Sequence, residues 1–158
     1  MTTLTLGEAL RASAARNARH EAIVDGERRI TYAELDRRVD RLAHGLQARG
    51  VTIGNVVAVL SQNAHEILEL YFACARLGAM LCPVNPRSTA EELVWTLKHS
   101  DATLVAAEGE LQGLLQTIEQ SLPTSVVIFR GDPVRAEWAR YEALIDDAPK
   151  DPAALPDV

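Results

Sequence analysis

Apolar residues along this chain follow two spacings, one typical of helices and one typical of short buried strands. Leu6, Leu10 and Ala14 recur at helical spacing, and the same spacing runs through residues 35, 39, 42 and 46. By contrast, every residue from 56 to 60 is apolar, which is typical of a strand covered on both faces. Because strands and helices alternate along the chain, we predict an α/β fold with a mainly parallel sheet and helices on both faces.

Turn and cap residues mark where several of these elements begin and end. Asp25-Gly26 separates two short strand-like runs and predicts a β-hairpin. Thr31 and Glu34 have the spacing of a capping box at the start of the helix that carries residues 35 to 46. Gly50 stands where a residue with left-handed backbone would end that helix.

A further helix is predicted to begin at Asn63 with Glu66 as its capping partner and to end at Gly78. Glu66 and Glu69 lie one turn apart and are interpreted as part of a solvated face. Apolar residues of a surface helix normally face the core. We therefore place five side chains of this helix inward: Ile67, Leu68, Tyr71, Phe72 and Ala75.

The second half of the chain continues the alternation of strands and helices. Residues 81 to 84 predict a strand, and Pro83 places it near a sheet edge or near a strand start, because proline lacks the amide hydrogen that an inner strand needs. Two overlapping capping boxes, Ser88 with Glu91 and Thr89 with Glu92, precede the next helix. The last predicted elements are strands at 103–107 and 126–129 and, between them, a helix at 111–121.

The length of 158 residues fits a single domain. We predict that residues 1–147 form one α/β subdomain and that residues 148–158, rich in Pro, Ala and Asp, form a linker tail. Hydrophobic residues make up 47% of the chain and charged residues 24%, a composition that indicates a globular rather than a disordered protein. The net charge of -6 argues against nucleic acid or an anionic membrane surface as a partner.

The cysteines and the N-terminus bear on the cellular compartment. Cys74 and Cys82, with four scattered histidines, match no zinc spacing and no disulfide framework, and we interpret them as reduced thiols in or near the core. Residues 1–10 do not form a signal peptide, and no apolar run approaches the ~20 residues that a membrane span needs. The expected location is the cytoplasm.

Several familiar catalytic motifs are missing from the sequence. Its nine glycines form neither a dinucleotide fingerprint nor a P-loop, and Lys98 and Lys150 are not placed to cradle phosphates. Ser61 follows the central predicted strand without a G-x-S-x-G elbow and is interpreted as a turn residue. Three arginines are placed on the polar side of an amphipathic helix: Arg37, Arg38 and Arg41.

Arg87 is the candidate binding residue. It follows Pro83-Val84-Asn85-Pro86 at the carboxyl end of a predicted strand and directly precedes a capped helix start. Open parallel sheets bind ligands at this edge, and both the free amides of a helix start and an arginine guanidinium favour phosphate. The alternative is a surface arginine that pairs with Glu91 or Glu92, and spacing alone leaves both interpretations open.

Five segments match one known pattern in order and spacing. They are ITYAEL at 30–35, the run at 50–60 with Asn55 at a position usually held by aspartate, the helix at 61–79, PVNPR at 83–87 and AEEL at 90–93. Together they resemble the N-terminal part of the adenylate-forming (AMP-binding) acyl-CoA synthetases and ligases. This superfamily includes fatty-acid, 4-chlorobenzoate and 4-coumarate CoA ligases and firefly luciferase.

The resemblance implies a two-step reaction in the complete enzyme. ATP and a carboxylic acid give an acyl-adenylate and pyrophosphate, and CoA then displaces AMP to give acyl-CoA. It therefore implies ATP, Mg²⁺ and CoA as cofactors of the complete enzyme, and the remainder of the ligase chain as a partner. In several CoA ligases the arginine of the N-P-R loop contacts CoA phosphate groups, which implies this role for Arg87.

The same resemblance implies that the chain is inactive in isolation. The loop rich in Ser, Thr and Gly that wraps the ATP phosphates in this family does not occur in the sequence. We therefore expect no catalytic residue, no metal site and no cofactor in this segment by itself. Fatty, aryl and alicyclic acids all remain open as substrates of the complete enzyme.

Two alternative functions differ in what they require of the sequence. A non-catalytic dimerisation or partner-docking module derived from the same fold would expose an apolar patch and could form a homodimer through it. A free-standing flavodoxin-like nucleotide binder is disfavoured, because no phosphate-binding loop rich in Gly, Ser or Thr follows any predicted strand.

Overall fold

The computed structural model describes residues 5–148 and Leu155. Its main sheet has five strands in the order β4-β3-β5-β6-β7, and every neighbouring pair is parallel. The predicted mainly parallel α/β sheet is therefore confirmed. The strands are β3 (Val56–Leu60), β4 (Met80–Val84), β5 (Ala102–Glu108), β6 (Ser125–Phe129) and β7 (Ala139–Arg140).

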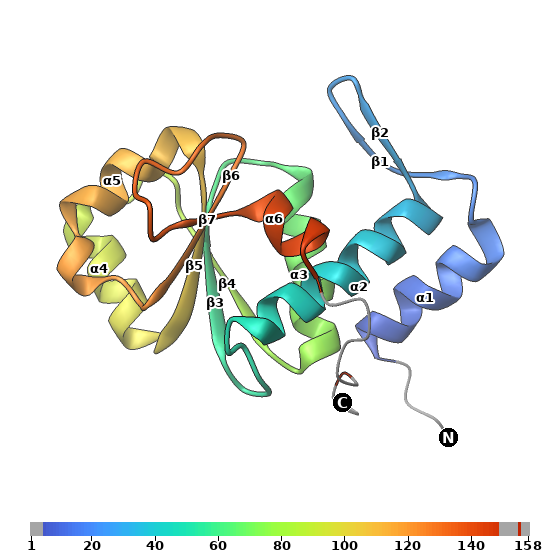
Figure 1. Cartoon of the computed structure of the whole chain (residues 1–158), viewed down its shortest axis with the longest axis horizontal. Coiled ribbons are helices and arrows are strands. Elements are labelled where there is room, and N and C mark those ends of the chain that lie inside the picture. The colour runs from blue at the N-terminus through green and yellow to red at the C-terminus, as the bar shows by residue number, and fades with distance from the viewer. Residues whose placement is uncertain (1–4, 149–154, 156–158) are drawn as a thin grey trace.

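Helices cover both faces of this sheet, as the sequence predicted (Figure 1). One face carries α4 (Ala90–His99) and α5 (Gln112–Thr117), and the other carries α2 (Tyr32–Ala48), α3 (His65–Leu77) and α6 (Tyr141–Asp146). A further helix, α1 (Leu6–Asn17), packs on α2 and α3. None of the described helices combines the length and the apolar character that crossing a bilayer requires.

The alternation of side chains along each strand produces two hydrophobic cores. In β3, Val57 and Val59 belong to the core beneath α2 and α3, whereas Ala58 and Leu60 belong to the core beneath α4 and α5. All five residues of β3 are buried. The uninterrupted apolar run therefore correctly predicted a strand covered on both faces. β4 lies at the sheet edge, where Pro83 costs no ladder hydrogen bond to an outer neighbour.

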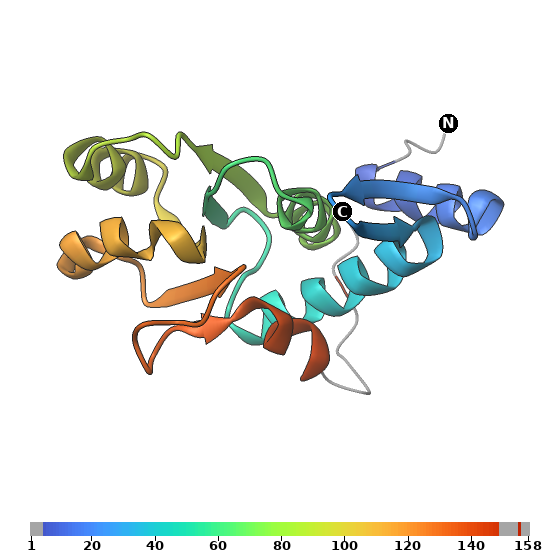
Figure 2. The same ribbon diagram turned by 90° about the horizontal axis from the view of Figure 1, so that it is seen from above.

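A separate antiparallel hairpin lies beside α1 and α2, away from the main sheet (Figure 2). Its strands are β1 (Glu21–Asp25) and β2 (Arg28–Thr31), which pair Asp25 with Arg28. The two turn residues are Gly26 and Glu27, and Gly26 has φ 58°, a left-handed backbone that glycine adopts without steric cost. The hairpin prediction is confirmed, with its turn one residue later than Asp25-Gly26.

Most predicted helix ends are found where the sequence placed them. Gly50 and Gly78 have φ values of 86° and 65°, so both are left-handed residues that end α2 and α3. Thr89 and Glu92 form both bonds of a capping box, so Thr89 and not Ser88 caps α4. Thr31 Oγ1 accepts from the Glu34 amide at 3.2 Å. The reciprocal bond of that box is not formed in the described part of the chain.

The prediction for the inward face of α3 was wrong for Leu68 and Tyr71, whereas Ile67 and Phe72 are partly buried against the core as predicted. Its ionisable residues His65, Glu66, Glu69 and Arg76 are buried. Leu68 and Tyr71, predicted to face the core, are 46% and 43% exposed. The helix begins after Ala64 rather than at Asn63, and Ala64 provides no side-chain cap.

The C-terminal third also differs from the sequence prediction. The helix expected at 111–121 consists of α5 flanked by two short 3-10 turns, Gly109–Leu111 and Glu119–Ser121. β7 and α6 were not predicted. Of the predicted tail at 148–158, residues 149–154 and 156–158 lie outside the described residues, and Ala148 is buried.

Candidate functional site

A cleft of about 750 Å³ opens at the carboxyl ends of β3 and β4. The segment after β3, residues 61–63, forms one side, and residues 83–87 at the end of β4 form the other. Ile67 of α3 and Leu111 add apolar surface to its lining. This is the edge at which open parallel sheets bind ligands, so the cleft is the candidate functional site.

Arg87 lines this cleft, and its side chain is exposed. Its backbone amide donates to Oδ1 of Asn85 at 2.9 Å, which fixes the turn that leads into α4. The Glu92 carboxylate accepts from the Thr89 amide at 2.8 Å as part of the capping box. Within the described residues, Arg87 forms no ion pair with Glu91 or Glu92. The guanidinium therefore faces the cleft edge without an acidic partner from the start of α4.

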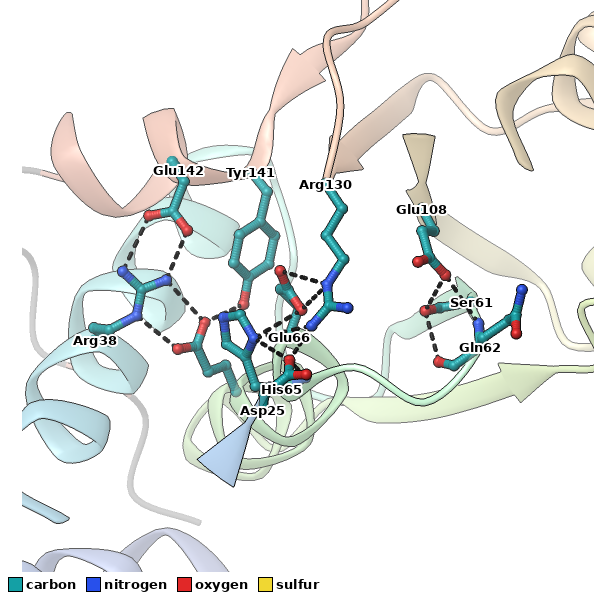
Figure 3. A network of polar contacts seen from close by, with 11 residues as sticks. Asp25, Arg38, Ser61, Gln62, His65, Glu66, Glu108, Arg130, Tyr141 and Glu142 are labelled. Carbon is teal, nitrogen blue, oxygen red and sulfur yellow. Dashed lines mark hydrogen bonds and ion pairs between the residues drawn. The ribbon is translucent and has the colours of Figure 1, made fainter. Parts of the chain in front are cut away.

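Ser61 also lines this cleft. Its Oγ is 2.7 Å from the carbonyl oxygen of Gln62 and 3.0 Å from Oε2 of Glu108, which also accepts from the Gln62 amide at 3.1 Å (Figure 3). Glu108 ends β5, so its carboxylate joins the loop after β3 to the neighbouring strand. These contacts fix a turn, in agreement with the interpretation of Ser61 as a turn residue rather than a nucleophile.

A network of hydrogen bonds joins α2, α3 and α6 (Figure 3). Arg38 of α2 donates to Glu69 of α3 from Nε at 2.6 Å and from Nη2 at 3.1 Å. The same guanidinium donates to Glu142 of α6 at 3.0 and 2.8 Å. Tyr141 of α6 donates its hydroxyl to Oε2 of Glu69 at 2.8 Å. Glu66 and Glu69 were interpreted as part of a solvated face, and that interpretation is wrong, because both are buried.

Burial and hydrogen bonding shift the pKa values of Arg38, Tyr141 and Glu142 in this network. Burial alone would lower the pKa of Arg38, but its hydrogen bonds to Glu69 and Glu142 raise that pKa above its ordinary value. Burial and the adjacent Glu69 carboxylate raise the pKa of Tyr141 well above 10.0, so its hydroxyl stays a hydrogen-bond donor. Burial opposes ionisation of Glu142, yet Arg38 outweighs it and lowers the pKa of Glu142.

A second polar cluster joins the hairpin to the sheet and to the start of α3 (Figure 3). Oδ2 of Asp25 accepts from the backbone amide of His65 at 3.2 Å and lies 2.8 Å from its Nδ1. Arg130, which follows β6 with a left-handed backbone (φ 53°), donates from Nε to Glu66 at 3.0 Å and from Nη2 to Asp25. Asp25 thus supplies the cap of α3 that Ala64 lacks, from 40 residues away in the sequence.

The same cluster contains three side chains of the types that bind metal ions. Asp25, His65 and Glu66 each offer a ligand atom, and these atoms lie within 4.8 Å of one another. However, the Arg130 guanidinium already pairs with both carboxylates, and the His65 hydrogen bond lowers the pKa of Asp25 further than burial raises it. A cation would have to displace Arg130. The donor set therefore fits an ion-pair network and does not fit the oxygen-rich shell that Mg²⁺ prefers.

The two cysteines lie apart from the cleft lining. Cys74 is buried in α3 and Cys82 is half-buried in β4, and both are free thiols. Burial raises the pKa of Cys74 to about 12. Cys74 is therefore a core residue, as the sequence predicted.

A three-layer α/β fold with a cleft at the carboxyl ends of its strands defines the class of protein: an open parallel-sheet domain. Residues 10–157 match the family model described as AMP-binding enzyme, and the chain belongs to this family. The predicted resemblance is thereby confirmed.

Relatives with established names give the same result. The chain is 37% identical over 137 residues to a feruloyl-CoA synthase from Amycolatopsis sp, covering 87% of this chain and 26% of that protein. It is 35% identical over 131 residues to a long-chain-fatty-acid–CoA ligase from Thermus thermophilus, covering 82% of this chain and 24% of that protein. The chain thus spans about a quarter of the length of these curated relatives.

Solved structures show the same architecture. A fatty acyl CoA synthetase from Mycobacterium tuberculosis superposes with a TM-score of 0.80 at 26% sequence identity, covering 97% of this chain and 30% of that one. A benzoate CoA ligase from Burkholderia xenovorans superposes with a TM-score of 0.84 at 24% identity, covering 97% and 30% of the two chains. The likeness to the second protein concerns the fold alone.

Proposed function

We propose that this chain is the N-terminal segment of an ATP-dependent acyl-CoA ligase and that it has no ligase activity in isolation. The observation that carries the proposal is the match of residues 10–157 to the AMP-binding enzyme family. The names of the relatives support an acid–thiol ligase, since the feruloyl-CoA synthase and the fatty-acid–CoA ligase both form CoA thioesters by name. In this proposal the complete enzyme joins a carboxylic acid to CoA through an acyl-adenylate, with ATP and Mg²⁺, in the cytoplasm.

Inactivity of the isolated chain is proposed from the chemistry of its loops. Adenylation needs donors that hold the ATP phosphates and a cation that offsets their charge. In the described segments after β3 and β4 there is neither a lysine nor a glycine. Lys98 lies in the last turn of α4, at the end of the helix remote from the cleft. The phosphate-binding loop and the Mg²⁺ ligands are therefore assigned to the remainder of the ligase chain.

Arg87 is proposed to contact a phosphate group of CoA in the complete enzyme. Its side chain is exposed at the cleft edge, and Arg87 lies three residues before Ala90, the first residue of α4. A guanidinium binds phosphate through two parallel hydrogen bonds, and the positive end of the helix dipole adds to the attraction. No side chain of this segment is proposed as a catalytic residue.

The test compares two exposed arginines in the longer polypeptide encoded by the same reading frame. Arg87→Ala is expected to raise KM for CoA about tenfold, as the loss of one charge-assisted phosphate contact would, while ATP–pyrophosphate exchange stays unchanged. Arg37→Ala, at an exposed position of α2, is the matched control and should leave both quantities unchanged. Equal effects of the two substitutions on KM for CoA would contradict the role of Arg87. A longer polypeptide that forms no acyl-CoA from any acid would contradict the proposed function itself.

A second candidate function is a non-catalytic dimerisation or partner-docking module. The observation that favours it is the exposed apolar surface of α3, where Leu68 and Tyr71 are 46% and 43% exposed. Sedimentation of the 158-residue chain at increasing concentration separates the two functions. A monomer at every concentration would contradict dimerisation, and a dimer together with the absence of ligase activity from the longer polypeptide would favour the module.

A further inference from the structure

The carboxylate of Glu108 reaches from the end of one strand to the loop that follows the neighbouring strand (Figure 3). β3 and β5 are parallel neighbours, and Leu60 lies opposite Ala107 in their register, so Glu108 comes level with the first residue after β3. Oε2 of Glu108 is 3.0 Å from Ser61 Oγ and 3.1 Å from the Gln62 amide nitrogen. One carboxylate oxygen therefore accepts from the Gln62 amide and lies within hydrogen-bonding distance of the Ser61 hydroxyl.

The alternation of side chains along β5 explains why Glu108 reaches this loop. Leu104 and Ala106 belong to the core beneath α2 and α3, whereas Val105 and Ala107 belong to the core beneath α4 and α5. Side chains two residues apart lie on the same face of a strand, so Glu108 is on the face that α3 covers. The loop after β3 leads into α3 and so turns towards that same face.

Residues 61–63 depend on Glu108 for their position. They belong to no helix or strand, and Ala64, which precedes α3, provides no side-chain cap. In the part of the chain that the structure describes, every side-chain hydrogen bond that joins residues 61–63 to another segment involves Glu108. The same three residues form one side of the cleft, and the segment 83–87 that ends with Arg87 forms the other. Glu108 therefore holds one wall of the cleft on the sheet that also carries the other wall.

Glu108 acts on the cleft without lining it. Its side chain is half-buried, and the residues that line the cleft do not include it. Among the described residues it forms no ion pair, so its partners are the hydroxyl and the amide of the loop. Both contacts are made by one oxygen atom. A neutral amide oxygen at the same position could accept both hydrogen bonds, so the arrangement needs an acceptor and not a negative charge.

We propose that Glu108 is a positioning residue of the CoA site: it holds residues 61–63 at the distance from Arg87 at which the cleft accepts CoA. This inference rests on the proposed function, in which Arg87 contacts a phosphate group of CoA. Displacement of one wall by about 1 Å is enough to lose contacts that need both walls at once. Glu108 itself contacts neither CoA nor the reacting carboxylate.

The first test measures both half-reactions in the longer polypeptide encoded by the same reading frame. Glu108→Ala is expected to raise KM for CoA about tenfold, while kcat and ATP–pyrophosphate exchange, which needs no CoA, stay within about twofold. Glu108→Gln keeps an acceptor oxygen, and its KM for CoA is expected to stay within about threefold of that of the unsubstituted enzyme. The matched control is Glu110→Ala, which removes an exposed glutamate two residues along the chain and should change neither half-reaction.

The second test measures the loop itself in the 158-residue chain, by amide hydrogen exchange followed by NMR. Glu108→Ala is expected to speed exchange of the Gln62 amide at least about fivefold, because that amide loses its acceptor, whereas Glu108→Gln should leave the rate nearly unchanged. The Val134 amide is the internal reference. It donates to Gln112 Oε1 at 2.9 Å, so a different side chain holds it and its exchange should stay the same in every variant.

Unchanged exchange at Gln62 in Glu108→Ala would overturn the inference, because Glu108 would then not hold the loop. Equal losses in both half-reactions would also overturn it, since Glu108 would then serve only the stability of the fold. A Glu108→Gln variant as impaired as Glu108→Ala would overturn it by showing that the charge itself acts.

Failure of the inference and failure of the proposed function give different results. An active enzyme in which Glu108→Ala leaves KM for CoA unchanged, despite faster exchange at Gln62, refutes the inference and leaves the proposed function intact. A longer polypeptide that forms no acyl-CoA from any acid refutes the proposed function and the CoA role of Glu108 with it.

Discussion

Arg38 and Glu69 form a two-bond ion pair between α2 and α3, with Nε 2.6 Å from Oε1 and Nη2 3.1 Å from Oε2. The Glu69 side chain has no exposed surface, and that of Arg38 is only 11% exposed. Taking both charges out of water costs free energy, and each charge is therefore tolerated only because the other is present. The pair holds α3 with its polar face inward and so leaves its apolar face outward.

Arg38→Met should destabilise the chain by about 3–5 kcal/mol, because it leaves the Glu69 carboxylate buried without its cation. Urea unfolding followed by circular dichroism measures this free energy of unfolding. The matched control is Arg11→Met, which removes an exposed ion pair with Asp40 whose side chains are 61% and 42% exposed. Its expected cost is below about 1 kcal/mol. Equal, small losses in the two variants would show that the buried pair is not needed for folding.

Tyr141→Phe should cost about 1–3 kcal/mol, because it removes the hydroxyl that donates to the buried Glu69 carboxylate at 2.8 Å. Tyr71→Phe is the matched control, since Tyr71 is 43% exposed and its change should stay within about 0.5 kcal/mol. Thermal or urea unfolding of both variants measures the difference. A Tyr141→Phe variant as stable as the unsubstituted chain would refute a structural role for this hydrogen bond.

Gly45→Ala should destabilise the chain by about 1–3 kcal/mol, since overpacking of a close contact has costs of this size. A Cβ at position 45 would lie 2.3 Å from the carbonyl oxygen of Leu144, so α2 and α6 would have to separate. Gly113→Ala is the control: a Cβ there meets nothing within 4 Å, and alanine favours the helical backbone of α5 by about 1 kcal/mol. The two substitutions should thus have opposite signs in urea unfolding, and equal signs would contradict the close approach of α2 and α6.

The free energy of unfolding should fall as the pH drops below about 5. The His65 hydrogen bond lowers the pKa of Asp25 below 3.8, and Arg38 lowers that of Glu142 below 4.5. The unfolded chain then binds more protons than the folded chain in this range. The stabilisation is therefore complete above the pKa values of the two carboxyl groups in the unfolded chain, and it is lost as the pH falls through their pKa values in the folded chain.

Urea unfolding between pH 7 and pH 3 measures this dependence. The double variant Asp25→Asn, Glu142→Gln should be less stable than the unsubstituted chain at pH 7 and should lose less stability on acidification. A pH profile that the two substitutions leave unchanged would mean that neither carboxylate is coupled to folding through its ion pairs.

The main sheet and several helix ends could be predicted from local sequence. The run of five apolar residues in β3 predicted burial on both faces, because a half-exposed strand would alternate. Gly50 and Gly78 marked the ends of α2 and α3, since a positive φ excludes most other residues. Arg87 follows β4 and lines a cleft, and its contact with CoA stays a prediction.

The orientation of α3 could not be predicted from local sequence. Periodicity identifies a helix, but α3 has two apolar sets. One is Ile67, Leu68, Tyr71, Phe72 and Ala75, and the other is Leu70, Ala73, Cys74 and Leu77. The choice between them depends on the partners of Glu69, which lie 31 and 72 residues away in the sequence. The presence of apolar residues on both sides was the signal that both faces of the helix are suited to burial.

The polar clusters and the last elements were missed for a similar reason. β7 and α6 have two and six residues, too few for a periodic pattern, and their place is fixed by contacts with β6 and α2. Arg41 donates to the carbonyl oxygens of Ile145 and Asp146 at the end of α6, at 2.6 and 2.7 Å. Only the fold brings these groups, more than 100 residues apart, together.

ATP–pyrophosphate exchange by the 158-residue chain shows whether this segment activates a carboxylate by itself. The assay uses fatty, aryl and alicyclic acids in turn, with a no-acid control and with the longer polypeptide from the same reading frame as the positive control. No acid-dependent exchange is expected from the 158-residue chain, and exchange is expected from the longer polypeptide. Acid-dependent exchange by the 158-residue chain alone would contradict its proposed inactivity.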